Sequence, residues 1–282
     1  MYINASYIKP RTLDEAVALL AAGEARILSG GTDFYPALGD RVVREAVVDV
    51  SGLGELHGVS FEADCFRIGG LTTWSEIIRT PLPRCFDALK SAAREVGGVQ
   101  IQNRGTVAGN LCNASPAADG VPPLLALDAE VELVSKAGVR RMPLADFIVG
   151  NRKTRRKPDE LLTSVMVPRE LEDAASTFVK LGARRYLVIS ISMVAAVVQV
   201  RDRRILEARI AVGSCSAVAR RLRALEGELV GTWVRDGVGG AVRPEHLAPL
   251  SPINDVRATA EYRMDASLRL VQRALNSCVE NG

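Results

Sequence analysis

The sequence predicts an α+β fold with two domains. In the first half of the chain, two capping-box patterns at residues 12–15 and 73–76 each open a helix beside a short strand pattern. Residues 169–175 form a charged segment where the composition shifts. Beyond them, strand patterns and amphipathic helices are typical of a small sheet with helices packed on one face. We therefore expect a first domain at residues 1–172 and a second at residues 173–282.

The elements expected in the first domain follow from apolar spacing. A helix begins at Thr12 and ends at Gly23, because its apolar side chains recur on one helical face. Residues 129–134 alternate polar and apolar side chains, and a Lys-Ala-Gly turn returns the chain through residues 139–142 as a hairpin. The other expected elements are strands at 25–28, 46–50, 65–69 and 162–167, a helix at 87–96 and a buried apolar segment at 121–127.

The second domain is expected to contain an antiparallel sheet. Strand patterns cover residues 177–181, 192–200 and 206–212, and the last two are joined by a plausible hairpin turn at residues 201–204. Residues 218–225 and 266–278 have the apolar periodicity of helices.

Composition excludes several classes of function. Lys and Arg number 36 against 33 Asp and Glu, so no global positive charge argues for nucleic acid. The N-terminal residues lack a signal-peptide pattern, and no apolar run is long enough to span a bilayer. Five scattered cysteines without a C-x-x-C pair favour reduced thiols in a cytoplasm and no metal site on this chain. With only His57 and His246, a histidine triad or zinc site is not expected.

The stretch at residues 29–36 is the first candidate binding loop. It follows a short apolar run, and the adjacent glycines Gly30 and Gly31 can adopt backbone dihedrals closed to other residues. Such a turn can direct successive N–H groups at one anion, as phosphate-binding turns do. A Gly-Gly pair is more commonly only a turn, so this stretch alone does not decide the function.

A second stretch of the same character, residues 105–119, strengthens the first. It holds small residues and many hydrogen-bonding groups, and burying each of these without a partner costs roughly 1–3 kcal/mol. A tightly packed polar loop is the alternative explanation. Two such loops beside strands suit a dinucleotide whose pyrophosphate lies between them. Neither loop has the G-x-G-x-x-G spacing, so a Rossmann domain is not expected.

Residues 152–157 carry five cations in six positions, Arg-Lys-Thr-Arg-Arg-Lys. Such a run is usually a solvated loop. The functional alternative is a docking patch for an acidic partner surface or a phosphate, and the sequence leaves both open.

These motifs together resemble the FAD-binding medium subunit of the molybdenum hydroxylases, the family of xanthine dehydrogenase, carbon monoxide dehydrogenase and 4-hydroxybenzoyl-CoA reductase. The family loop A-G-G-x-S-x-x-P corresponds here to Ser-Gly-Gly-Thr-Asp-Phe-Tyr-Pro at 29–36, and T-I-G-G-N corresponds to Thr-Val-Ala-Gly-Asn at 106–110. Further matches at 152–154, 159–162, 178–182 and 260–263 extend the resemblance over essentially the whole chain. It implies an FAD domain of two α+β subdomains, of the vanillyl-alcohol-oxidase-like type, followed by a smaller C-terminal α+β domain.

The resemblance also implies site residues. Leu162 would lie by the isoalloxazine, Lys180 would be a cation near the flavin, and Thr106, Asn113 and Asp119 would bond cofactor hydroxyls. The residues implied to contact the pyrophosphate, the ribityl chain or their surroundings are Ile27, Leu28, Ser29, Gly30, Gly31, Thr32, Asp33, Phe34, Ala108, Gly109, Asn110 and Ser115.

Two of these positions depart from the family pattern. Ala108 replaces a glycine, so it must have negative φ unless the loop has shifted. Asp33 stands where many members carry serine, and a carboxylate beside a pyrophosphate would have to point to a hydroxyl or cap the following segment.

The function implied by the resemblance is electron transfer through non-covalent FAD, with no catalytic acid or base on this chain. Neither histidine lies in a proposed flavin loop where it could form a covalent link. The molybdenum cofactor would belong to a large partner subunit and the 2Fe-2S clusters to a small one, with NAD or another molecule as acceptor. The alternatives are a stand-alone flavin-dependent reductase and a non-enzymatic dinucleotide-binding module.

Overall fold

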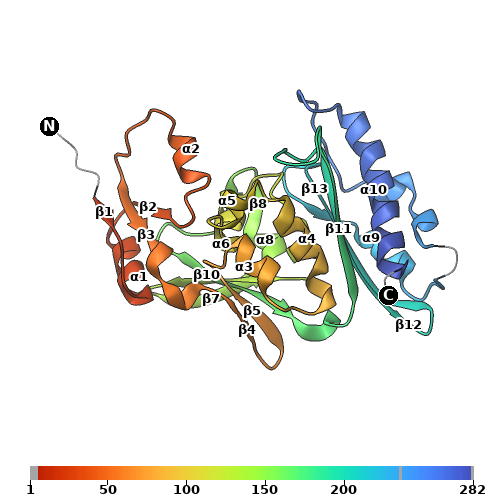
Figure 1. Ribbon diagram of the computed structural model, residues 1–282, viewed down its shortest axis with the longest axis horizontal. Helices are drawn as coiled ribbons and strands as arrows, with labels where there is room; N and C mark the ends of the chain where they lie inside the picture. The colour runs from red at the N-terminus through yellow and green to blue at the C-terminus, as the bar shows by residue number, and fades with distance from the viewer. Residues whose placement is uncertain (1–5, 235–236, 281–282) are drawn as a thin grey trace.

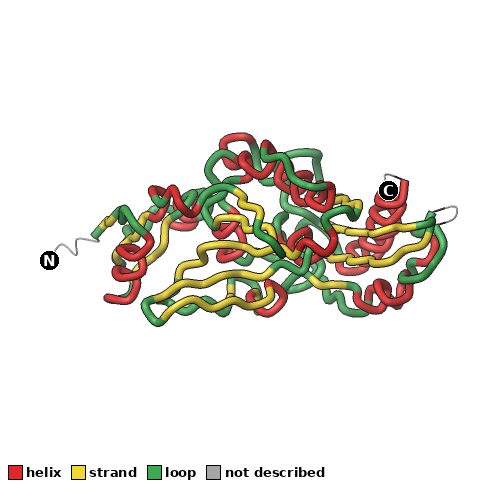
Figure 2. Tube along the Cα trace, turned by 90° about the horizontal axis from the view of Figure 1, so that it is seen from below, coloured by secondary structure: helices red, strands yellow, loops and turns green. Residues whose placement is uncertain are grey.

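The computed structural model describes residues 6–234 and 237–280. Three sheets of three or more strands follow one another along the long axis of the molecule, with the N-terminal sheet at one end and the C-terminal helices at the other (Figure 1). Turned by 90°, the molecule shows the strands of the central sheet running along one side, with helices above them (Figure 2). The predicted α+β class, with an antiparallel sheet in the C-terminal domain, is confirmed.

The first sheet is small and parallel, in the order β1 (Tyr7–Ile8), β3 (Ala46–Asp49), β2 (Ala25–Leu28). Helix α1 (Leu13–Ala22) packs its apolar face against it, and Thr12 accepts the Glu15 N–H at 3.2 Å as the N-cap. The Glu15 carboxylate accepts from the N–H of Arg11 rather than Thr12, so the first expected capping box is only half formed.

The central sheet is antiparallel and has the order β4 (Val59–Phe61), β5 (Cys65–Gly69), β10 (Leu161–Pro168), β6 (Glu130–Ser135), β7 (Gly138–Pro143). The expected β6–β7 hairpin is present. At Thr73 the capping box is complete, since Thr73 and Glu76 exchange both bonds. The helices between the strands of this part of the chain are α3 (Trp74–Arg79), α4 (Asp87–Glu95), α5 (Val99–Gln102), α6 (Val107–Asn113), α7 (Val121–Ala126) and α8 (Leu144–Phe147). Helices α6 and α8 contact the central sheet, whereas α4 and α7 contact the strands of the third sheet.

The third sheet has the order β11 (Ala175–Leu181), β12 (Ser192–Arg201), β13 (Arg204–Gly213), β14 (Arg220–Arg221) and is antiparallel. Helices α9 (Arg223–Leu229) and α10 (Ala260–Glu280) form an apolar core with one face of it. Side chains on its other face, including Met193, Ala195 and Val197, join the core of the first domain. The sheet is therefore covered on both faces.

The helix expected at residues 218–225 is wrong. Residues 220–221 form strand β14, and α9 begins only at Arg223. The Arg221 guanidinium donates to Asp128 at 2.6 Å and to Glu226 at 2.5 Å, which fixes this segment against the first domain in an extended conformation. The 3.6-residue spacing of its apolar side chains could not reveal these ion pairs.

The chain crosses from the central to the third sheet through a 3-10 turn at Arg169–Leu171. The division of the chain between residues 172 and 173 stays a prediction. Within the described part of the chain, no helix has both the length and the hydropathy required to cross a membrane.

Candidate functional site

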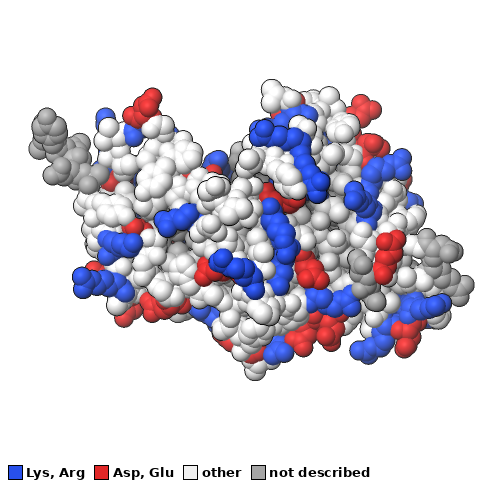
Figure 3. Space-filling view, viewed as in Figure 1, with Lys and Arg blue, Asp and Glu red and all other residues white. Residues whose placement is uncertain are grey.

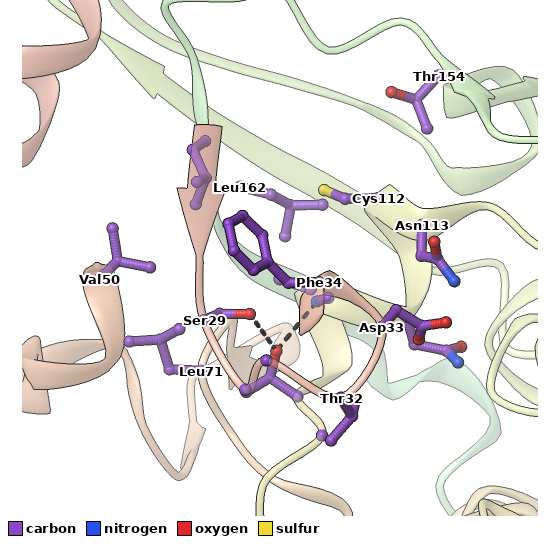
Figure 4. A pocket seen from close by; sticks show the side chains of 18 of the residues that line it. Ser29, Thr32, Asp33, Phe34, Val50, Leu71, Cys112, Asn113, Thr154 and Leu162 are labelled. Atoms are coloured by element: carbon purple, nitrogen blue, oxygen red, sulfur yellow. Dashed lines mark hydrogen bonds between the residues drawn. The ribbon is translucent and has the colours of Figure 1, made fainter. Parts of the chain in front are cut away.

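A cleft of about 1060 Å³ lies between the edge of β2, helix α6 and the short hairpin of β8 (Ile148–Gly150) and β9 (Lys153–Thr154) (Figure 4). Its size is at the upper end of the range for sites that hold a cofactor. In the space-filling view, the outline of the molecule is indented between the N-terminal lobe and the larger part of the molecule (Figure 3).

The first glycine loop runs from β2 into the short helix α2 (Phe34–Leu38). Gly31 has a φ of 76°, in the left-handed region, and a Cβ there would lie 2.8 Å from the ring of Tyr35. A Cβ on Gly30 would collide with the carbonyl oxygen of Arg104. Glycine at these two positions therefore permits the turn and its close approach to the backbone that precedes α6.

The second glycine loop is joined to the first by hydroxyl groups. Thr106 is the N-cap of α6, and its Oγ1 accepts the N–H of Gly109 at 3.0 Å. The same oxygen lies 3.2 Å from Ser29 Oγ, so one hydroxyl pair links the loops (Figure 4). Either hydroxyl can donate in this pair, because Thr106 Oγ1 has a second lone pair beside the one that accepts from Gly109.

Ala108 lies within α6, and its N–H donates to the carbonyl oxygen of Gly70 at 2.9 Å. It is not among the described residues with positive φ, so the predicted negative φ is confirmed. The alanine is compatible with this loop because the helix, rather than a left-handed turn, sets the backbone here.

The donors and charges of the cleft fit an anionic dinucleotide. Asn110 Oδ1 is buried and has no hydrogen-bond partner within the described structure, which is the state expected of a group that a ligand satisfies. The charged side chains lining the cleft are one carboxylate, Asp33, and four cations, Arg26, Arg152, Lys153 and Arg156. This excess of positive charge complements a diphosphate.

Asp33 occupies the N-cap position of α2, but its backbone is in the right-handed helical region and its side chain makes no capping bond. The expectation that its carboxylate caps this segment is therefore wrong. The side chain is exposed and lines the cleft, and its bonding to a cofactor hydroxyl stays a prediction.

Most of the predicted site residues lie together. The predicted residues that line the cleft are Ile27, Ser29, Gly30, Gly31, Thr32, Asp33, Phe34, Thr106, Ala108, Gly109, Asn110, Asn113 and Leu162. Those that do not line it are Leu28, Ser115, Asp119 and Lys180. Leu28 is buried in the protein interior, and Ser115 Oγ accepts from the N–H of Ala117.

Asp119 and Lys180 pair with each other. Lys180 Nζ donates to both carboxylate oxygens, at 3.0 and 2.9 Å, and Ser190 Oγ donates to the same carboxylate at 3.1 Å. Burial raises the pKa of Asp119 to about 6, although the nearby Lys180 and the hydrogen bonds oppose the shift. This group joins the loop after α6 to the strand β11 of the second domain.

Sequence reasoning missed the apolar wall of the cleft and part of its rim. Val50, Leu71 and Trp74 line the cleft, yet their sequence pattern is that of core residues. Arg26, in β2, lies 4.9 Å from the centre of the Phe34 ring, and no motif marks it. The rim at residues 149–156 was signalled by its run of cations and by the family match at 152–154.

Two non-glycine residues with positive φ meet at this rim. Ala114 has φ 47° and Arg152 has φ 54°, and the N–H of Arg152 donates to the carbonyl oxygen of Ala114 at 2.9 Å. The Arg152 guanidinium donates to Asn113 Oδ1, which leaves the amide nitrogen of Asn113 as a donor for other groups. Strained backbone of this kind is often found at binding sites.

The basic run at residues 152–157 is not uniform. The Arg156 guanidinium donates to the carbonyl oxygens of Lys157, Pro158 and Glu160, at 2.9, 3.3 and 2.8 Å, so it stabilises the loop itself. Lys153, Arg155 and Lys157 are exposed. Docking by these exposed cations stays a prediction.

Burial raises the pKa of Cys112, the thiol that lines the cleft, to about 11, so it is uncharged at neutral pH. The described residues contain no group of three or more His, Cys, Asp or Glu side chains arranged to hold a metal ion.

Comparison with known proteins identifies the family. Residues 3–170 match the model described as "FAD binding domain in molybdopterin dehydrogenase", and residues 177–278 match "CO dehydrogenase flavoprotein C-terminal domain". A putative xanthine dehydrogenase FAD-binding subunit from Escherichia coli (strain K12) is 31% identical over 284 residues, covering 99% of this chain and 97% of that protein.

Two further relatives agree. The nicotinate dehydrogenase FAD-subunit of Eubacterium barkeri is 39% identical over 193 residues, which cover 66% of this chain and 65% of that subunit. The structure of carbon monoxide dehydrogenase from Hydrogenophaga pseudoflava, lacking the Mo-pyranopterin moiety of its molybdenum cofactor, has a chain that superposes with a TM-score of 0.89 at 26% identity, covering 98% of this chain and 97% of that one. This chain therefore belongs to the FAD-binding subunits of the molybdopterin dehydrogenase family, the medium subunits of the molybdenum hydroxylases.

Proposed function

We propose that this chain carries FAD as the electron-transfer subunit of a molybdenum hydroxylase complex. In this proposal a large partner subunit holds the molybdenum cofactor and oxidises the substrate, and a small partner subunit relays the electrons through 2Fe-2S clusters. FAD, when bound, accepts these electrons and passes them to NAD or another acceptor. The observation that carries the proposal is the pair of glycine loops, which are joined by the Ser29–Thr106 contact and together line a cleft of cofactor size.

The residues of this chain would bind and orient the cofactor. Backbone N–H groups near Gly31 would donate to the pyrophosphate, and Asn110 and Asn113 would bond polar groups of the FAD. Leu162 and the apolar wall would exclude water from the ring system. Among the described residues, no histidine lines the cleft and Asp33 is the only carboxylate there, which supports electron transfer over an acid–base reaction of this chain.

Two further assignments belong to this proposal. The chain divides into an FAD-binding domain at residues 1–172 and a C-terminal domain at residues 173–282, which the limits of the two matching family models support. The complex works in the cytoplasm, which the five free cysteines support.

Purification from the natural host tests the complex. A tagged chain should retain a molybdenum-containing large subunit and a 2Fe-2S small subunit in equal amounts, and NADH should bleach its flavin if NAD is the acceptor. A chain that purifies without such subunits and turns over a substrate alone would favour the stand-alone reductase.

The flavin is expected to be non-covalent. No histidine lines the cleft, and the raised pKa of Cys112 disfavours the reactive thiolate. The purified protein should be yellow, and acid precipitation should release FAD into the supernatant. Flavin that remains in the pellet, or FMN in place of FAD, would contradict this expectation.

A further inference from the structure

Helix α2 has an apolar sequence and yet buries no residue. Its residues are Phe-Tyr-Pro-Ala-Leu, and none of them is buried, with Tyr35 59% exposed. A helix of this composition ordinarily buries a face. In Figure 1 it stands on an arch above the first sheet, apart from the central sheet. Its surface is therefore open to groups from outside this chain.

The two sides of α2 face different hollows. Phe34 and Ala37 line the cofactor cleft, so bound FAD would cover that side. Leu38 lines a second hollow of about 650 Å³, together with Val42, which is 81% exposed. The helix is thus a wall between the cofactor cleft and this second hollow, and FAD would leave the second side uncovered.

The second hollow is strongly basic. Of the residues that the structure describes, Arg26, Arg41 and Arg44 line it, against one carboxylate, that of Glu45. Arg41 is held in place, because its guanidinium donates to the carbonyl oxygens of Leu38, at 3.2 Å from Nε, and of Ala37. Arg26 is held over the Phe34 ring. Three guanidinium groups beside exposed apolar side chains complement a partner that is both acidic and apolar.

We propose that the second hollow and the outer side of α2 dock an acidic segment of a partner subunit that also carries an apolar side chain. The proposal rests on the proposed function, which supplies the partner subunits. Tyrosine and arginine are among the residue types enriched at the energetic centres of protein interfaces, and both are exposed here. A free phosphate would satisfy the arginines but would leave Tyr35 and Val42 uncovered, so the surface favours a protein.

This docking has a consequence for the cofactor. A partner that fixes the outer side of α2 also fixes Phe34 and Ala37 on the cleft side, because the helix is one wall of both hollows. Assembly should therefore raise the affinity of this chain for FAD, and FAD should raise the affinity of assembly by the same factor, as thermodynamic linkage requires.

The test uses the complex purified with its large and small subunits. Arg41→Glu combined with Arg44→Glu should weaken retention of this chain about tenfold or more on dilution, and should reduce the salt dependence of the wild-type complex. Neither residue lines the cofactor cleft, so the free variant should keep its FAD affinity. Val42→Ser should weaken retention without changing its salt dependence.

A matched control reverses two exposed arginines elsewhere. Arg201→Glu with Arg203→Glu, at the turn between β12 and β13, makes the same change in net charge and should leave retention unaltered. A wild-type chain that never assembles with these subunits would refute the proposed function itself. If the wild type assembles, three results refute the docking alone. The Arg41→Glu, Arg44→Glu variant could be retained as tightly as wild type, the control variant could lose retention equally, or the free Arg41→Glu, Arg44→Glu variant could lose FAD. A fourth is arginine-dependent binding of inorganic phosphate or of phosphatidylserine vesicles with assembly unchanged.

Discussion

Replacing Gly31 by valine is expected to weaken FAD binding by an order of magnitude or more. Valine at a φ of 76° is strained, and its Cβ would clash with the ring of Tyr35. The backbone of the loop would therefore have to change conformation. The N–H groups of the loop would then lose their hydrogen bonds to the charged pyrophosphate, each worth roughly 1.5–3 kcal/mol. About 1.4 kcal/mol corresponds to a tenfold change in affinity.

Gly109→Val should have a similar effect for a different reason. Gly109 is helical, so its backbone is not strained, but a Cβ there would lie 2.8 Å from Thr106 Oγ1 and 3.2 Å from Ser29 Oγ. The valine would break the hydroxyl link between the loops. Ala108→Gly should leave FAD affinity nearly unchanged and lower stability by about 1 kcal/mol, since glycine is unfavourable inside a helix.

The matched control is Gly231→Val. Gly231 has a φ of 81°, a Cβ added there would meet no described atom within 4 Å, and the residue lies away from the cleft. Valine there introduces comparable backbone strain without blocking a ligand. The measurement is FAD affinity of the refolded apo-protein, with far-UV circular dichroism as a check on folding. Wild-type affinity in both Gly31→Val and Gly109→Val would mean that these loops do not hold the cofactor.

The fold was largely predictable because its determinants are local. The capping bonds of Thr12 and Thr73 and the alternation along β6 and β7 act within a few residues, so short windows of sequence reveal them. The helix expected at residues 218–225 failed because Arg221 is fixed by Asp128, which is 93 residues away in the chain. Only the folded structure brings the two together.

The candidate site also has a part that the sequence predicts and a part that it does not. The glycine loops could be recognised because glycine and small polar residues are unusual in a packed core. Val50 and Leu71 could not be recognised as site residues, because an apolar residue that lines a cleft has the same sequence pattern as one that fills a core. The pairing of Asp119 with Lys180, which are 61 residues apart, was equally hidden, and the two charges suggested ligand contacts instead.

Removing the Lys180 ammonium should destabilise the protein more than any surface change. The pair is nearly fully buried, with side-chain exposures of 7% for Lys180 and 10% for Asp119. Lys180→Met preserves most of the volume but leaves an uncompensated carboxylate, and breaking a buried pair in this way costs roughly 3–5 kcal/mol. Adding Asp119→Asn to Lys180→Met should recover much of this lost stability, because neither the buried ammonium nor the buried carboxylate is then present.

The stability lost in Lys180→Met should be smaller in acid than at higher pH. The folded-state pKa of Asp119 is raised to about 6, so the folded protein binds this proton more tightly than the unfolded chain does. The contribution of Asp119 to stability is therefore present in acid and is lost as the pH rises from about 4 to about 6. Without Lys180 this pKa should rise further, so the penalty of Lys180→Met should be smaller at pH 5 than at pH 8. Urea unfolding at both pH values measures this penalty. The control is the double variant Lys180→Met with Asp119→Asn, whose destabilisation should not depend on pH. An equal penalty at the two pH values would show that Asp119 does not carry the charge that Lys180 neutralises.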